Sequence, residues 1–542
     1  MRFVSVIGLV ALLALAWGLS VNRRGIKLRP VLWGLGLQFL FAVIILQENA
    51  WSFVGMALLA MLIVAFIFRH DIQDSPKPAV VSAIIAGGSL ITGALLVFIS
   101  QWIPLTTIMM LVIVIMIFNT YQLHRPLLSR ELASVLVVGL VAMAIAGGSY
   151  GQIVFRGFSD NVAAFLNLSS YGAAFLFGNL VDTTLFFPSD TSTWPGFGFQ
   201  FAFRVLPTII FFGGFMAVLY YLGIMQYIID GISRFMRWTI GTSGAETLSC
   251  SANIFVGQTE APLLIKPFLN DMTRSELLTI MVGGFATVAG GVLAGYIAMG
   301  IDPGHLVAAS VMSAPAALAV AKIIYPEVEH STTAGDVDLP PITSGTNVVD
   351  AASNGIVDGL KLAVNVGAML IGFIALIAVA DVILNGVDRL IDGIILKGPL
   401  VAYTTTSGLS PVVHEYAGIF PGSLKTLFGT LLRPLAFLMG VSWADAAEVG
   451  NLLGIKLTLN EFVAFGTLGN YQSSGALEPR SIIIATYALT GFANFSSIGI
   501  QIGGIGALAP KRHADISSLA TRAMFGGAIA SFITATVAGM LL

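Results

Sequence analysis

The chain has 542 residues, of which 56% are hydrophobic and only 10% are charged. Because soluble domains carry about 25% charged residues, this composition excludes an ordinary soluble protein and indicates a polytopic membrane protein. The net charge of −2 argues against nucleic-acid binding, and the single cysteine, Cys250, excludes an internal disulfide framework and a cysteine-based zinc site.

Apolar segments of about 20 residues, the length needed to cross a bilayer, recur along the chain. The first resembles a signal peptide but lacks a small-residue cleavage site, so we expect it to remain as a membrane span. No strand pattern competes with these segments, and the sequence predicts an all-α fold. The expected spans are 3–20, 31–47, 51–68, 79–100, 105–121, 132–148, 198–224, 276–299, 306–324, 365–384, 481–507 and 516–541.

Three further segments do not look like spans. Residues 157–187 and 226–240 are amphipathic, which is typical of helices that lie along the membrane interface. Residues 326–349 form a polar connector, which we expect to be cytosolic and the most mobile part of the chain. This connector divides the later part of the chain into two halves.

The two halves share a plan. In the first, residues 244–269 are too polar at their centre to cross simply, and the following span is interrupted at 286–291. In the second, residues 425–467 are expected to break around Gly440 and Gly454, and the following span is interrupted at 491–497. Each half therefore predicts a re-entrant hairpin followed by a broken transmembrane helix, and together they predict two inverted repeats.

These features predict a division of the chain into seven parts. They are an N-terminal transmembrane hairpin of the scaffold (1–47), inserted accessory helices (48–150), interfacial helices with a scaffold span (151–240), the first repeat with its hairpin and broken helix (241–325), the cytosolic linker (326–349), an interfacial helix with a scaffold span (350–424), and the second repeat with its hairpin, broken helix and last span (425–542).

Each predicted hairpin carries a glutamate near its tip, Glu260 in the first half and Glu461 in the second. A carboxylate at membrane depth costs on the order of 3 kcal/mol or more, so such groups persist where they face a water-filled cavity or bind something. The pairing indicates a secondary transporter with its site near the bilayer midplane. A passive channel would need a continuous polar stripe, and an intramembrane enzyme would need a nucleophile–base or metal pair; the sequence displays neither.

The polar groups near Glu260 suggest two kinds of ligand. Gln258, Thr259 and Glu260 offer amide, hydroxyl and carboxylate groups, which suits a neutral ligand with mixed donors and acceptors. Hard oxygen ligands for a small monovalent cation come from the four residues Asn253, Val256, Thr287 and Val288. Two alternatives stay open, because Glu260 and this oxygen set could instead satisfy the ends of neighbouring helices.

In the second half, Glu461 with Asn494 and Ser497 would suit the vicinal hydroxyls of a sugar, since a carboxylate is a strong acceptor. Phe492 offers an apolar wall for a ring. The alternative is that Lys456 neutralises Glu461 in a simple ion pair.

At these residues the chain resembles the concentrative nucleoside transporter family. The resemblance rests on Gly-Gln-Thr-Glu-Ala-Pro-Leu at 257–263, Gly-x-Lys-x-x-x-Asn-Glu-Phe-Val-Ala-Phe at 454–465, Gly-Phe-Ala-Asn-Phe-Ser-Ser at 491–497 and Ala-Pro-Lys-Arg at 509–512. It covers residues 1–47 and about 157–542.

The resemblance implies a sodium-coupled nucleoside symporter, a multi-pass protein of the cytoplasmic membrane that forms a homotrimer and moves its transport domain as an elevator. Na⁺ would be the coupling ion, with no organic cofactor, although some members look proton-coupled. Carried over by position, the nucleobase would be held by Gln258, Thr259, Glu260 and Val292, the ribose by Glu461, Asn494 and Ser497 beside Phe492, and sodium by Asn253, Val256, Thr287 and Val288.

One stretch departs from the family pattern. Residues 51–148 hold about four extra spans with almost no intramembrane charge. An even number of spans preserves the orientation of everything downstream, so we interpret this stretch as a peripheral, inserted scaffold unit. If it covered the subunit contact face, the trimer implied by the resemblance would be in doubt.

Overall fold

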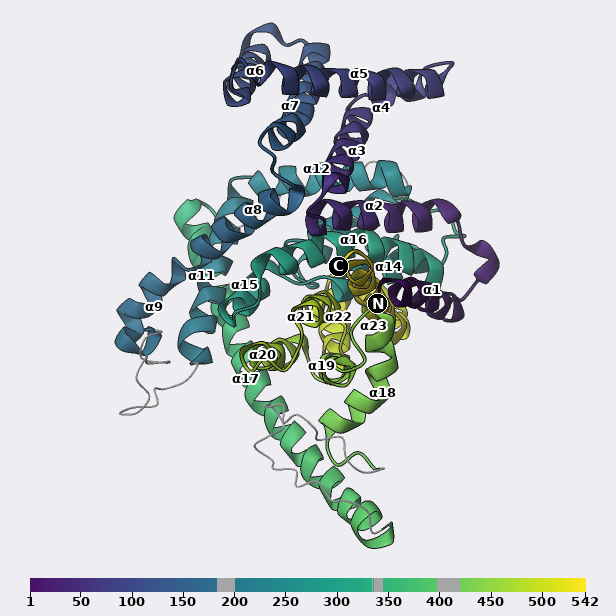
Figure 1. The fold of residues 1–542 in the computed structure, drawn as a ribbon, viewed down its shortest axis with the longest axis vertical. Coiled ribbons are helices and arrows are strands. Elements are labelled where there is room, and N and C mark those ends of the chain that lie inside the picture. The colour runs from purple at the N-terminus through teal and green to yellow at the C-terminus, as the bar shows by residue number, and fades with distance from the viewer. Residues whose placement is uncertain (183–199, 334, 336–344, 397–419) are drawn as a thin grey trace. The chain divides into compact units, whose positions relative to one another are not determined.

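The structure is a computed structural model that describes residues 1–182, 200–333, 335, 345–396 and 420–542. All regular elements within these ranges are helices (Figure 1), which confirms the predicted all-α class. In the described chain, nine helical segments are long and apolar enough to cross a membrane, as a polytopic membrane protein requires. They are Leu28–Leu46, Ala50–Ile67, Pro78–Ile99, Pro126–Ala146, Gly151–Val181, Phe201–Tyr221, Arg274–Ala298, Pro303–Ile324 and Pro510–Leu541.

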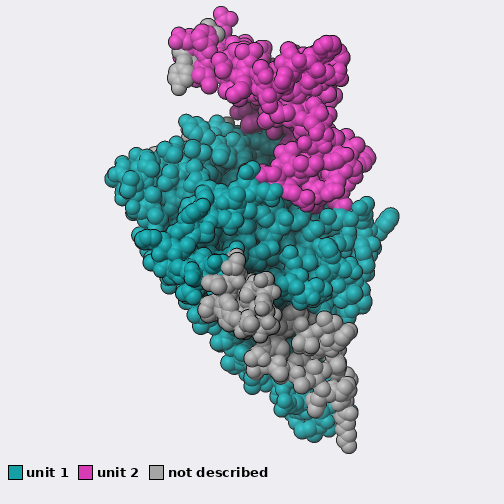
Figure 2. Space-filling view, turned by 60° about the vertical axis from the view of Figure 1, so that its left-hand side comes forward, with its two compact units in different colours: residues 1–38, 159–540, 542 teal, residues 39–158, 541 magenta. Residues whose placement is uncertain are grey.

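The chain forms two compact units (Figure 2). The smaller unit is residues 39–158 with Leu541, and the larger unit is residues 1–38 and 159–540 with Leu542. The predicted sites all lie in the larger unit.

The smaller unit is a group of apolar helices with a core of its own. That core contains Val64, Leu96, Met109 and Val138, which are contributed by four different helices. Many other large apolar side chains of these helices are exposed, as expected for surfaces that face lipid. The helices are α3 (Ala50–Ile67), α4 (Arg69–Gln73), α5 (Pro78–Ile99), α6 (Leu105–Phe118), the π-helical turn η2 (Asn119–Leu123) and α7 (Pro126–Ala146).

The first helices of the larger unit include the two segments predicted to lie at the interface. Residues 157–187 contribute to α8, α9 and η3, with 183–187 outside the described residues, and 226–240 lie within α12. Since Gly151–Val181 also meets the length and composition criterion for a span, the interfacial placement remains a prediction. These elements are α1 (Arg2–Gly18), η1 (Arg23–Gly25), α2 (Leu28–Leu46), α8 (Gly151–Leu166), α9 (Ser169–Phe177), η3 (Gly178–Val181), α11 (Phe201–Tyr221) and α12 (Ile224–Ile240). Residues 39–46 of α2 and 151–158 of α8 belong to the smaller unit.

The remaining helices build the buried core of the larger unit. The expected span 276–299 is divided into α14 and α15, and 481–507 is divided into α21 and α22. The first group is α13 (Gly244–Ala252), η4 (Ala261–Phe268), α14 (Arg274–Ala286), α15 (Gly290–Ala298), α16 (Pro303–Ile324), α17 (Val348–Asp388) and η5 (Arg389–Ile395). The second group is α18 (Leu424–Leu438), α19 (Ala446–Thr458), α20 (Glu461–Ser473), α21 (Pro479–Leu489), α22 (Phe495–Leu508), η7 (Pro510–Arg512) and α23 (His513–Leu541).

Short polar residues fix where these core helices begin. Capping boxes start α13 at Ser243 and α14 at Thr273, in each case with a glutamate three residues on. Asparagine side chains cap α20 at Asn460 and α22 at Asn494 by accepting backbone N–H bonds. Because a cap satisfies amide donors that have no partner within the helix, these helices can begin inside the protein rather than at its surface.

Candidate functional site

The first acidic tract forms the turn between α13 and η4. Every residue of α13 is buried, and α13 packs against η4, so the two elements make a helical hairpin with this tract at its tip. The Glu260 carboxylate accepts a hydrogen bond from the Gly257 N–H (3.1 Å). Glu260 is exposed, whereas most of the surrounding turn is buried. Its carboxylate is thus held in place by the backbone and is still accessible to a ligand.

The tip of this hairpin is bound to the second half of the chain through Gln501 of α22. The Gln501 amide donates to the Gln258 side-chain oxygen (3.0 Å) and to the Met281 carbonyl (3.1 Å), and it is fully buried. Thr259 lies against Gly504, three residues beyond Gln501 on the same helix. Sequence reasoning missed Gln501, although an amide in an apolar helix two turns after Asn494, and so on the same face, was an available signal.

The second acidic tract lies between α19 and α20, which pack against each other as a second hairpin. The chain leaves helical geometry at Leu459 and Asn460, and Glu461 is the first residue of α20. The prediction of a break around Gly454 is wrong, because Gly454 lies inside α19. A Cβ atom there would clash with the Phe428 ring of α18, so this glycine serves close helix packing.

The Glu461 carboxylate is buried and is held by one residue from each broken helix. Its Oε1 accepts a hydrogen bond from the Tyr296 hydroxyl (3.1 Å), and its Oε2 accepts one from the Asn494 amide (3.0 Å). Only 3% of Glu461 is exposed. Asn494 is itself fixed, since its Oδ1 accepts from the Ser497 N–H (2.8 Å) and the Ser496 hydroxyl (2.7 Å). The sequence analysis did not predict Tyr296 as a site residue, although a tyrosine hydroxyl near the end of an apolar span was a visible indication.

Lys456 does not form the ion pair that the sequence left open. Its ammonium group donates to the Ala488 carbonyl (2.7 Å) and the Thr490 carbonyl (3.2 Å), and no carboxylate oxygen of the described residues is paired with it. Lys456 is fully buried. It therefore satisfies carbonyls at the end of α21, where the helix dipole favours positive charge.

The two helix breaks contact each other. Thr287 follows α14 in an extended conformation, and Thr490 follows α21 in the same way. Gly491 adopts a φ of +117°, and its Cα lies so close to the carbonyls of Phe285 and Ala286 that a side chain would not fit. The interruptions predicted at 286–291 and 491–497 thus meet backbone to backbone.

Replacing Gly491 by alanine is expected to lower the free energy of unfolding by at least about 1–3 kcal/mol, the cost of a positive φ in a residue with a Cβ. The added Cβ would also lie 2.7 Å from the Phe285 carbonyl oxygen and 2.9 Å from that of Ala286. Thermal unfolding in detergent measures the effect. Gly499→Ala is the control, because that Cβ meets nothing within 4 Å in the helix interior; equal stability of the two variants would contradict the argument.

The four residues predicted to bind a cation surround the first break. The Phe255 carbonyl accepts from Gly290 N–H (3.0 Å), which joins the hairpin turn to the start of α15. The Thr287 hydroxyl donates to the Gly283 carbonyl (2.8 Å), and the Asn253 amide lies beside Gly283. Asn253 is buried, with neither its amide oxygen nor its nitrogen hydrogen-bonded. An unpartnered buried amide oxygen close to the first break fits a site for a small monovalent cation.

The three other predicted residues also lie at the breaks. Val292 is buried in the first turn of α15, and Phe492 lies in the second break with 9% of its surface exposed. Ser497 is buried at the start of α22. The site residues therefore come from the two hairpin turns and the two helix breaks, and Tyr296 and Gln501 connect the halves.

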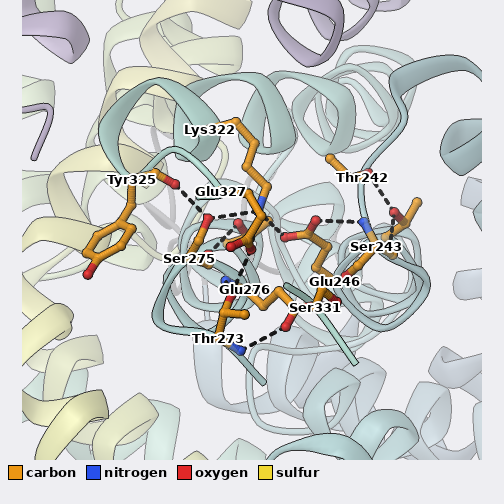
Figure 3. Close-up of polar contacts among 12 residues, drawn as sticks. Thr242, Ser243, Glu246, Thr273, Ser275, Glu276, Lys322, Tyr325, Glu327 and Ser331 are labelled. Atoms are coloured by element: carbon orange, nitrogen blue, oxygen red, sulfur yellow. Dashed lines mark hydrogen bonds and ion pairs between the residues drawn. The ribbon is translucent and has the colours of Figure 1, made fainter. Parts of the chain in front are cut away.

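A second buried polar network ties the beginnings of α13 and α14 to the end of α16 (Figure 3). The Lys322 ammonium lies 2.7 Å from the Glu246 carboxylate and donates to the Ser275 hydroxyl (2.9 Å). The Glu276 carboxylate accepts from the hydroxyls of Ser331 and Thr333, both at 2.6 Å. This network was not predicted, because its members are spread over nearly 90 positions of sequence.

The network corrects one expectation about the connector 326–349. Ser331 and Thr333 are buried, and the Thr333 carbonyl accepts from Gly244 N–H (3.0 Å) at the start of α13. The first residues of the connector are thus fixed on the core, where the sequence predicted mobility. Residues 334 and 336–344 lie outside the described residues.

The fold and the site define a polytopic helical membrane protein with polar groups gathered at two helix breaks. Three family models match the chain: "Na+ dependent nucleoside transporter N-terminus" at residues 7–67, "Nucleoside recognition" at 202–302, and "Na+ dependent nucleoside transporter C-terminus" at 305–539. The chain belongs to the Na⁺-dependent nucleoside transporter family, whose members are transporters and not enzymes.

Relatives and solved structures agree with this membership. Sodium/nucleoside cotransporter 1 of Mus musculus is 42% identical over 406 residues, which are 72% of this chain but only 56% of that protein. An uncharacterized transporter of Haemophilus influenzae is 40% identical over 75% of this chain and 91% of its own length. The structure of CNTnw in an inward-facing substrate-bound state is 31% identical, with a TM-score of 0.71 over 100% of this chain and 98% of that one.

Proposed function

We propose that this chain is a Na⁺-coupled symporter that imports nucleosides across the cytoplasmic membrane. The observation that carries the proposal is the buried Glu461 carboxylate, which Tyr296 and Asn494 hold from the two different broken helices. A carboxylate in so enclosed a place is costly unless it binds a ligand that donates hydrogen bonds. The vicinal hydroxyls of a ribose are such donors, and they carry no charge.

We assign the ribose to Glu461, Asn494 and Ser497, with Phe492 beside the sugar ring. The nucleobase would lie against the tip of the first hairpin, where the exposed Glu260 and the amide of Gln258 offer acceptors and donors to its edge. Thr259 and Val292 complete that side of the pocket. α15 connects the two subsites, because it begins at a hydrogen bond to the first hairpin and carries Tyr296 to Glu461.

Sodium would be carried as a co-substrate by the Asn253 amide oxygen, the Thr287 hydroxyl and the carbonyls of Val256 and Val288. The unpartnered Asn253 side chain supports this assignment. Residues bound to the ion would draw the hairpin turn against the first break, and so shape the nucleobase side of the pocket. Coupling requires that sodium and nucleoside strengthen each other's binding by the same factor.

An elevator movement of the two repeats against a scaffold, in a homotrimer, completes the proposal. CNTnw, which this chain resembles over nearly its whole length, has been solved in inward-facing and outward-facing states. The accessory helices 48–150 would belong to the scaffold; the matched family ranges stop at residue 67 and resume at 202. Native mass spectrometry of the purified protein tests the trimer.

Uptake into proteoliposomes tests the function directly. Radiolabelled uridine or adenosine should accumulate when an inward Na⁺ gradient is applied, and should not accumulate when choline replaces sodium. Uptake that depends on a proton gradient and not on sodium would mean that the coupling ion is H⁺ and not Na⁺. No uptake of any nucleoside under either gradient would reject the proposal.

The effect of Asn253→Ala on the unfolding temperature should depend on whether choline or sodium is present. In choline, we expect the variant to unfold at the same or a higher temperature than the parent, because a buried unsatisfied amide costs about 1–3 kcal/mol. In sodium, only the parent should gain stability, since a bound ion stabilises the folded state. Asn451→Ala is the control: Asn451 is equally buried and its amide oxygen is also unpartnered, but its NH₂ group donates to the Tyr471 hydroxyl (3.0 Å), so its effect on stability should be the same in both salts.

A further inference from the structure

The two halves of the chain place different groups at the same position relative to their helix breaks. In the first half, Asn253 precedes the break residue Thr287 by 34 positions, and in the second, Lys456 precedes Thr490 by 34. Each threonine immediately follows the helix that ends at its break. Each threonine hydroxyl also donates to the carbonyl four residues earlier, at 2.8 Å in both cases. Asn253 and Lys456 are therefore structural counterparts.

The counterparts differ in whether their polar atoms are satisfied. Asn253 is buried with both of its side-chain polar atoms unpartnered. Lys456 is buried with its ammonium donating to the Ala488 and Thr490 carbonyls, in the last turn of α21 and just beyond it. Carbonyl oxygens at the C-terminal end of a helix attract a monovalent cation, whether a metal ion or an ammonium group. The first break thus presents unpartnered polar atoms at the position where the second break presents an ammonium group.

We propose that the Lys456 ammonium is a tethered cation that occupies, in the second half, the place that sodium takes in the first. It keeps the second break in its binding shape in every transport cycle, so that this half needs no ion from solution. This inference rests on the proposed function. It makes Lys456 a positioning residue for Glu461 and Asn494, and it limits the transporter to one sodium per nucleoside.

The charges at the site agree with a single sodium. By formal charge, Glu260 and Glu461 contribute two negative charges and Lys456 contributes one positive charge. One sodium ion would make these groups neutral as a set, which suits a substrate without charge. Two sodium ions would leave an excess positive charge in a place where unbalanced charge is costly.

The experiment compares Lys456→Asn with Lys456→Met in the full-length protein. Asparagine reproduces the first-half group and leaves room for an ion, whereas methionine has a similar length and can neither donate to the carbonyls nor bind sodium. Nucleoside binding is titrated with Na⁺ in detergent, and folding is checked by size-exclusion chromatography. Lys77→Met, which removes an exposed lysine between α4 and α5, controls for loss of a lysine.

We expect the parent and Lys77→Met to show a Hill coefficient for sodium of about 1, because the coefficient is limited by the number of sites. Lys456→Asn should bind nucleoside only at raised sodium, with a Hill coefficient that approaches 2. Lys456→Met should bind weakly at every sodium concentration. Either variant giving the parent's sodium curve would overturn the inference.

The parent protein supplies a test that depends on no variant. Simultaneous uptake of radioactive sodium and nucleoside into proteoliposomes should give one ion per substrate, and two ions per substrate would overturn the inference while leaving sodium coupling intact. Absence of sodium-driven uptake would instead refute the proposed function. The two failures are therefore distinguishable.

Discussion

Glu461→Gln should weaken nucleoside binding by about 10- to 100-fold without unfolding the protein. Hydrogen bonds to a charged acceptor contribute about 1.5–3 kcal/mol, and each 1.4 kcal/mol is a factor of ten in affinity. The amide can keep both present contacts: its oxygen can accept from Asn494, and its NH₂ can donate to Tyr296, whose hydroxyl can also accept. The substitution therefore removes the charge and retains the local structure.

The measurement is nucleoside affinity by isothermal titration calorimetry at saturating sodium, with the unfolding temperature recorded for each sample. Glu478→Gln is the matched control, because Glu478 is an exposed glutamate at the start of α21 in the same half of the chain. Equal affinities of the two variants would remove Glu461 from the substrate site. A variant that loses affinity together with its unfolding transition would indicate a structural role only.

Lys322→Met should lower the free energy of unfolding by about 3–5 kcal/mol, the cost of leaving a buried charge without its partner. The side chains of Lys322 and Glu246 are only 5% and 2% exposed, and their charged groups lie 2.7 Å apart. The substitution would also take a donor from the Ser275 hydroxyl, which itself donates to the Tyr325 carbonyl (2.6 Å). Denaturant unfolding in detergent is the appropriate measurement.

Two further variants separate this effect from a general loss of charge. Lys361→Met removes an exposed lysine that lies 3.0 Å from Asp358, with side chains 68% and 74% exposed. That pair should be worth at most about 1 kcal/mol. Adding Glu246→Gln to Lys322→Met should restore part of the stability, because the stranded charge is then gone. If Lys322→Met is no more harmful than Lys361→Met, the buried pair does not stabilise the core.

The sequence was most informative where polar groups interrupt an apolar span. The breaks at Thr287 and Thr490 lie at or beside the predicted interruptions, since Gly-rich and polar runs disfavour a continuous helix there. It was misleading at Gly454, because a glycine inside a helix can serve close packing as well as a break. Composition does not distinguish a glycine that breaks a helix from one that allows close packing. At Gly454 the distinction comes from its neighbour in space, Phe428.

Contacts between distant segments were beyond a reading of the sequence. Tyr296 and Glu461 are 165 positions apart, and Gln258 and Gln501 are 243 apart. The sequence by itself does not show which of these polar groups lie next to each other, because only the packing of the two halves gives each its partner. The bound start of the connector escaped prediction for the same reason: Ser331 and Thr333 are typical loop residues until Glu276 accepts their hydroxyls.

The contact at Gly491 has a consequence for protein engineering. At Gly491 the backbone of the second helix break packs directly against the carbonyls of Phe285 and Ala286, so each predicted repeat depends on the other for a close-packed surface there. A chimera in which one half of the chain is exchanged with that of a homologue would have to keep both sides of this contact, Gly491 and the backbone at Phe285 and Ala286, to fold. Substrate preference is therefore better altered by changing single side chains than by swapping modules.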